Sequence, residues 1–204
     1  FLIWFALFAD SHTLVEEANA LFKAEQYTEA RKKYEEALVD APESPIIEYN
    51  LGTVHLAEND FEKARHHFQN ALQTRDPDLE TEIKFNLGHA GFRKAKTGLK
   101  DISDPEKVKR TVGMFRDAIR YWRDVLKLNP DHADAKQNIV VATNLLKDYL
   151  DRVKRFREAQ KKKQDQQKGK SLAELLKDLI KRQLEEEERT RSIIALQNGI
   201  KPYQ

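Results

Sequence analysis

Apolar residues recur along most of the chain at the three- and four-residue spacing of an amphipathic helix. The stripe in Ala30–Ala37 returns 34 residues later in Ala64–Ala71, and its internal spacing returns again in Ala118–Val125. A repeat of this length forms one pair of helices, which buries its apolar stripes by stacking on the next pair. The pattern therefore predicts an all-α solenoid of helical hairpins.

A second motif marks the first helix of each hairpin. Tyr49–Gly52 (YNLG) returns as Phe85–Gly88 (FNLG), and Pro42 and Pro130 follow second helices. The glycines let two antiparallel helices approach closely, and the aromatic residues fill the space beside them. Together these motifs resemble the tetratricopeptide repeat (TPR). The resemblance implies a TPR-type α-α superhelix, which is a right-handed solenoid.

The third repeat is longer than the others, with an insertion of 18 residues between its glycine and alanine positions. Within the insertion, Asp104 can cap a helix and Pro105 suits the first helical position. We therefore expect two lengthened helices, roughly 79–97 and 105–128, joined by a tight turn. A long helix from about 132 to 160 should then cap the array.

The composition changes at both ends of the repeats. The apolar run Phe1–Ala9 is interpreted as the end of a signal peptide or membrane anchor, and the alternative is a helical cap over the first repeat. The predicted organisation is residues 1–10 as this segment, 11–158 as the TPR domain, 159–170 as a Lys/Gln-rich linker or fraying helix, 171–197 as a separate amphipathic helix, and 198–204 as a tail.

The predicted C-terminal helix has an apolar stripe at helical spacing. No partner for it is evident in the neighbouring sequence, so we expect the stripe to dock on a partner or back onto the array. It comprises Leu172, Leu175, Leu176, Leu179 and Ile180.

The amino-acid composition favours thin layers of helices whose outer faces are exposed to solvent. Only 40% of the 204 residues are apolar and 34% are charged, which excludes a polytopic membrane protein and disfavours a thick core. The net charge is +2, but residues 16–48 carry net −5 and residues 147–170 carry net +6. The basic stretch could contact anionic lipid, nucleic acid or an acidic protein, although a solvated linker is the simpler interpretation. Nucleic acid is not the expected partner, because no aromatic or fold-level signal for it is present.

No arrangement of residues indicates catalysis or a cofactor. There is no cysteine, hence no thiolate ligand or nucleophile, and the histidines do not form a metal-binding pair. Gly169–Ser171 resembles the end of a phosphate-binding loop, but Gln164 occupies the place of the required first glycine. We therefore expect a non-enzymatic protein without metal or cofactor.

Binding is the remaining class of function. In TPR proteins the first helices line a concave groove that receives an extended peptide or a helix. Asparagine amides there could bond the backbone of a partner, or could instead bond neighbouring helices. The candidate groove residues are Asn19, Tyr49, Asn50, Thr53, Phe85, Asn86, His89 and Asn138.

One TPR subclass clamps a C-terminal carboxylate with two asparagines and three basic residues. Asn19 and Asn50 match the asparagines, but Val15, Glu82 and Asn86 occupy the basic positions. Without these cations the charge-assisted hydrogen bonds to a carboxylate are missing. A clamp for chaperone tails is therefore not expected.

Over nearly its whole length the chain also resembles the envelope-associated TPR proteins of the bacterial Bat (aerotolerance) group. That resemblance implies a scaffold in the periplasm or on the periplasmic face of the inner membrane, near the membrane through its N-terminus. It also implies von Willebrand factor A-type membrane proteins and a MoxR-type ATPase as partners. The alternatives are a cytosolic TPR chaperone or adaptor, and a basic binder of nucleic acid or anionic lipid. The residues that carry the resemblance are Val15–Phe22, Glu48–Gly52, Lys84–Gly88, Asn129–Asp131, Asp134–Asn138 and Glu186–Arg189.

Overall fold

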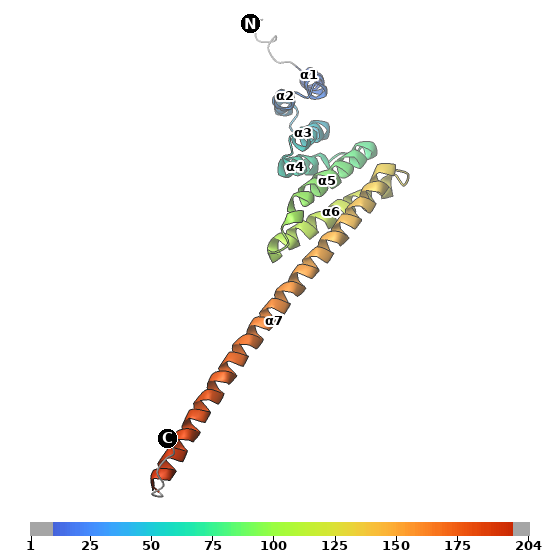
Figure 1. Cartoon of the computed structure of the whole chain (residues 1–204). Helices are drawn as coiled ribbons and strands as arrows, with labels where there is room; N and C mark the ends of the chain where they lie inside the picture. The colour runs from blue at the N-terminus through green and yellow to red at the C-terminus, as the bar shows by residue number, and fades with distance from the viewer. Residues whose placement is uncertain (1–9, 198–204) are drawn as a thin grey trace, which may run out of the picture. The chain divides into compact units, whose positions relative to one another are not determined.

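The computed structural model describes residues 10–197 (Figure 1). Every regular element in this range is a helix, which confirms the predicted all-α class. The expectations of an anchor in Phe1–Ala9 and of a tail at 198–204 lie outside the described residues. The helices are α1 (Ser11–Lys23), α2 (Tyr27–Asp40), α3 (Pro45–Ala57), α4 (Phe61–Ala71), α5 (Pro77–Thr97), a short 3₁₀ turn (Gly98–Lys100), α6 (Pro105–Leu128) and α7 (Ala133–Gln197).

Consecutive helices form three hairpins, α1 with α2, α3 with α4 and α5 with α6, and each hairpin packs on the next (Figure 1). The alanine–aromatic–alanine motifs lie in the interior. Ala64, Phe68 and Ala71 are fully buried, and Tyr34 is 2% exposed. The 34-residue repeat seen in the sequence is therefore the structural unit.

The tightest contact within a hairpin is made where a glycine on the first helix meets an aromatic ring on the second. A Cβ on Gly52 would lie 2.5 Å from the Phe68 ring, and one on Gly88 would overlap the Trp122 indole. Trp122 is held there because its Nε1 donates to the carbonyl of Phe85 at 3.1 Å. A larger residue in place of either glycine would force the two helices apart.

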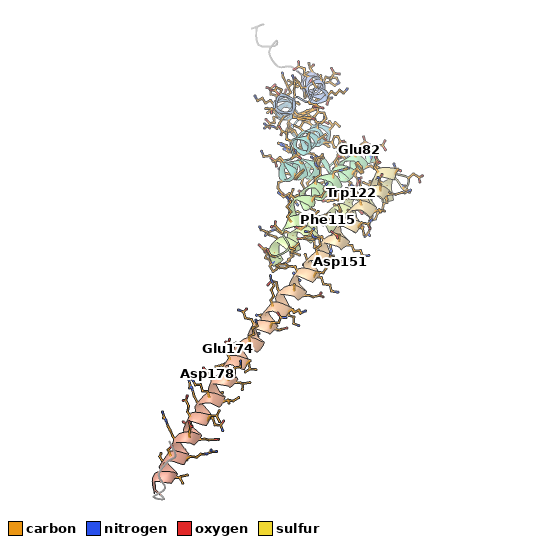
Figure 2. The ribbon with its side chains drawn as sticks, viewed as in Figure 1. Glu82, Phe115, Trp122, Asp151, Glu174 and Asp178 are labelled. Carbon is orange, nitrogen blue, oxygen red and sulfur yellow. The ribbon has the colours of Figure 1, made fainter. Side chains whose placement is uncertain are left out.

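The third hairpin has the two lengthened helices that the insertion predicts. Helix α6 begins at Pro105, where the Asp104 carboxylate accepts from the backbone N–H groups of Glu106 (2.9 Å) and Lys107 (3.2 Å). Phe115 and Trp122 of α6 lie in the core between these helices (Figure 2).

The structure divides into two compact units, one up to Val153 and one from Lys154. In the first unit, the start of α7 packs on the third hairpin as the predicted cap. Its Ala135, Ala142 and Tyr149 are fully buried, and the Tyr149 hydroxyl donates to the carbonyl of Asp101 at 2.6 Å.

Residues 159–170 differ from the expected linker, because they are helical throughout and belong to α7. Residues 171–197 are therefore not a separate helix. Lys, Gln and Ala, which are good helix formers, make up this stretch apart from Asp165 and Gly169. The stretch lacks apolar periodicity because its side chains are all exposed, not because the backbone is irregular. Between residues 10 and 197, no helix combines the length and apolar character that crossing a membrane needs.

Candidate partner-binding groove

The predicted groove residues lie on the first helices of successive repeats. Thr53 follows Asn50 by three residues and Tyr49 by four, and His89 follows Asn86 and Phe85 in the same way, so Thr53 and His89 each lie one turn along from the pair before them. Asn19 is on α1, Tyr49, Asn50 and Thr53 are on α3, Phe85, Asn86 and His89 are on α5, and Asn138 is on α7.

Three of the four asparagines bond to other helices of the same chain. Asn19 accepts from the Tyr34 hydroxyl at 2.6 Å, and Asn86 Nδ2 donates to the Tyr49 hydroxyl at 3.2 Å. Asn138 Nδ2 faces His89 Nε2 at a longer 3.4 Å. The alternative open in the sequence, that these amides join neighbouring helices, therefore holds for all three. An amide has two N–H donors and an acceptor oxygen, so each keeps capacity for a further bond.

Asn50 differs from the other three asparagines. It is half-buried, and in the described part of the chain its side chain has no hydrogen bond within the usual distance and angle limits. Thr53, one turn later, uses its hydroxyl to donate to the Tyr49 carbonyl at 3.0 Å. Asn50 is thus the amide of this face that is free to bond a partner.

Aromatic rings surround the middle of the face. Phe85 lies edge-on to His89, with ring centroids 4.7 Å apart, and within 4.6 Å of His132. Burial lowers the pKa of His89, and the nearby Arg93 guanidinium lowers it further. His89 is therefore neutral at neutral pH, so its ring can accept the Asn138 amide proton.

Tyr49 links two helices and has a perturbed hydroxyl. Burial raises its pKa, and the carboxylate of Glu82 raises it further, while the hydrogen bond from Asn86 opposes the shift. The phenol therefore stays protonated at neutral pH. Its O–H remains available as a donor on the groove face.

A hollow of about 840 Å³ lies at the start of α3 and α5 and beside the α6–α7 turn. Because Ile46 precedes Asn50 by four residues and Glu82 precedes Asn86 by four, the hollow adjoins the groove face. Acidic and apolar side chains dominate it. Its lining includes Ile46, Leu79 and Leu128, together with Asp76, Asp78, Glu82 and His132.

A polar cluster that the sequence interpretation missed lies between α3 and α4. Glu48, only 9% exposed, accepts from His67 Nδ1 at 2.7 Å and from Asn70 Nδ2 at 3.1 Å. The His67 ring stacks on His55 at 5.2 Å. The available signal was spacing: Glu48 and His55 occupy the same helical stripe as the buried Leu51, so both side chains point into the interior. There Glu48 is paired through both oxygens, whereas His55 Nδ1 has no hydrogen bond within the described residues.

Among residues 10–197, no group of three or more His, Asp or Glu side chains is placed to hold a metal ion. The polar side chains of the groove face are amides, hydroxyls and a neutral imidazole. This arrangement suits hydrogen bonding to a protein segment.

Comparison with known proteins supports the repeat assignment. Residues 15–93 match the tetratricopeptide repeat family model, and no curated protein matches the sequence. The Arabidopsis OM64 TPR domain is 18% identical, with 65% of this chain and 93% of that chain covered and a TM-score of 0.52. The first TPR of Spaghetti (RPAP3) bound to HSP90 peptide SRMEEVD is 19% identical, with 67% and 93% covered and a TM-score of 0.54.

A third structure, the MamA protein, is 15% identical, with 72% of this chain and 69% of that chain covered and a TM-score of 0.55. At these identities the likeness establishes the fold. The 34-residue period, the glycine–aromatic contacts and the family match agree on the same unit. Residues 15–93 therefore match tetratricopeptide repeats, and the repeat array has the fold of a TPR-type superhelical solenoid.

Proposed function

We propose that this chain is a non-catalytic scaffold that holds a segment of a partner protein along the groove face of α3 and α5. The main support is the hollow lined by Ile46 and Glu82. It adjoins the groove face, which is lined by amides and aromatic rings. TPR domains typically mediate protein–protein interaction, and one structural neighbour is bound to a peptide. That likeness agrees with the proposal without identifying the partner.

The charges of the hollow indicate the chemistry of the segment. Asp78 and Glu82 are exposed, whereas the apolar surface comes from Ile46, Leu79 and Leu128. A segment with Lys or Arg beside apolar residues would complement both features. An acidic tail would meet like charge, which agrees with the absence of the carboxylate-clamp cations.

The cellular setting is part of the proposal. The Bat-like motifs favour a scaffold in the periplasm or on the periplasmic face of the inner membrane, with von Willebrand factor A-type membrane proteins as partners beside a MoxR-type ATPase. Fractionation of the full-length protein tests the location. A pool found only in the cytosol would favour the alternative of a cytosolic chaperone or adaptor.

The groove is tested by in-cell cross-linking and mass spectrometry with two double variants. Asn50→Ala with Glu82→Lys removes the free amide and reverses the charge beside the hollow. Asn144→Ala with Glu36→Lys makes the same changes at exposed sites on α7 and α2. The first variant should lose several-fold of its cross-linked partner, and the second should keep it. Equal recovery of every partner by both variants would refute binding through the groove.

A further inference from the structure

Beyond the groove, α7 has an apolar surface in its C-terminal half. Six large side chains within 13 residues are each 51% to 60% exposed. Single exposed apolar residues are common on proteins, but a contiguous patch marks an interaction surface. The six are Leu172, Leu175, Leu176, Leu179, Ile180 and Leu184.

These side chains cover about half of the helix circumference. At about 100° per residue they span an arc of about 180°, bounded by Leu175 on one edge and Leu184 on the other. Lys177 and Arg182 lie just outside the two edges. Glu174 and Asp178, labelled in Figure 2, occupy the opposite face. The segment is therefore amphipathic, with cations along its borders.

The basic stretch before the patch faces the same way. Residues 154–170 contain eight Lys or Arg, all exposed, and six of them fall within the arc of the apolar patch. Two acidic residues, Glu158 and Asp165, share the arc. A cationic stripe thus leads directly into the apolar one. Its members are Lys154, Arg155, Arg157, Lys161, Lys162 and Lys168.

We propose that residues 154–184 of α7 lie flat on an anionic lipid bilayer. An interfacial helix buries an apolar face about 5–10 Å into the headgroup boundary, while basic side chains meet lipid phosphates. Lys and Arg at the borders bury their carbon stems and keep their charges at the surface. The helix lies on the bilayer because it is too polar to span it.

A second copy of the chain fits this face less well. A two-stranded coiled coil uses a narrow seam of two positions in seven, sustained over three to four heptads. Here the apolar arc covers about half of the circumference. It spans only about two heptads, and Gln183, Glu186 and Glu187 occupy the same arc at its end. The run Glu185–Glu188 would repel an anionic surface, which places the end of the bound segment at Leu184.

Vesicle co-sedimentation of the full chain tests this proposal. The probes are phosphatidylcholine vesicles with and without phosphatidylglycerol. The wild type should bind the anionic vesicles, and binding should fall steeply as salt is raised from about 0.1 M to about 0.5 M. Replacing Lys161, Lys162 and Lys168 with Gln should lower the bound fraction several-fold. The matched control replaces three lysines outside the arc with Gln and should bind nearly as well: Lys163, Lys170 and Lys181.

The apolar part is tested by Leu176→Gln with Leu179→Gln, since Gln keeps high helix propensity. This variant should also lose most anionic binding, with its helicity checked by circular dichroism. Because all variants share residues 1–10, differences between them report on α7 alone. The proposal fails if on-arc and off-arc variants bind alike, or if the leucine variant binds as the wild type does. It also fails if the leucine change converts a dimer to a monomer in sedimentation without altering vesicle binding.

Discussion

Gly88 lies where another residue's side chain already occupies the space that a Cβ atom would need. The Trp122 indole is in contact with it and is itself fixed by a hydrogen bond to the Phe85 carbonyl. Gly88→Ala should therefore destabilise the protein by about 1–3 kcal/mol through overpacking. Urea unfolding followed by circular dichroism measures this change.

Gly113 is the matched control for Gly88. It also lies within a helix, but a Cβ there would meet no atom within 4 Å. Gly113→Ala should stabilise by up to about 1 kcal/mol, because alanine has the higher helix propensity. A destabilising effect of the same size at both positions would show that the Gly88 contact has no special role.

His89 should make stability depend on pH. Its pKa is lowered in the folded state, first by burial and then by Arg93, so the unfolded state binds the proton more readily. The resulting loss of stability is absent above the ordinary histidine pKa of about 6.5 and grows as pH falls below it. His89→Gln removes the titration and keeps an amide toward Asn138. The decrease in unfolding free energy between about pH 7.5 and about pH 5.5 should be smaller in this variant than in the wild type. Equal decreases would contradict the assignment.

Among the helices, those of the third hairpin begin with side-chain caps, whereas α1 and α2 have none. Asp104 satisfies two backbone N–H groups at the start of α6. Asp104→Ala should therefore cost about 1 kcal/mol in thermal or urea unfolding. Gln26→Ala, at the uncapped start of α2, should change stability much less. If the two substitutions cost the same, the cap at Asp104 contributes nothing.

Helix α7 shows why element boundaries are hard to predict from periodicity alone. Residues 159–170 lack an apolar stripe and were predicted to be a linker or fraying helix, yet they are helical. A stripe reports which face is buried, and a helix exposed on every side has none. Propensity was the better indicator for this stretch, since it contains no proline and one glycine.

At the scale of the whole molecule, the buried residues form several small clusters along the repeat array, which is typical of a solenoid. Among residues 10–194, whose side chains the structure describes, the last buried one is Val153, and side chains from Arg157 to Ile194 are exposed. A chain that ends at Ala159 should therefore keep the thermal midpoint of the full chain and lose only helical circular dichroism signal. A clearly lower midpoint would show that the removed residues stabilise the repeats.

Most of the fold could be predicted from the sequence because each repeat carries the same pattern of small and aromatic residues. Gly52 and Gly88, with Phe68 and Trp122, follow from spacing, and the insertion predicts the long third hairpin. The groove was predicted less completely. Its residues lie on the expected helices, but the sequence left open whether the amide of Asn86 bonds a neighbouring helix or a partner. Distances between helices decide that, and spacing along one helix does not contain them.

The sequence by itself determined the class, the repeat unit and the phase of each helix, because periodicity and small–large pairing are local properties of the chain. The tertiary structure decided which polar groups meet. It joined Glu48 to His67, Asn138 to His89, and the separate side chains Ile46, Leu79 and Leu128 into one hollow. Such contacts depend on how neighbouring helices are stacked. The identity of one residue does not show which residue of another helix it will contact.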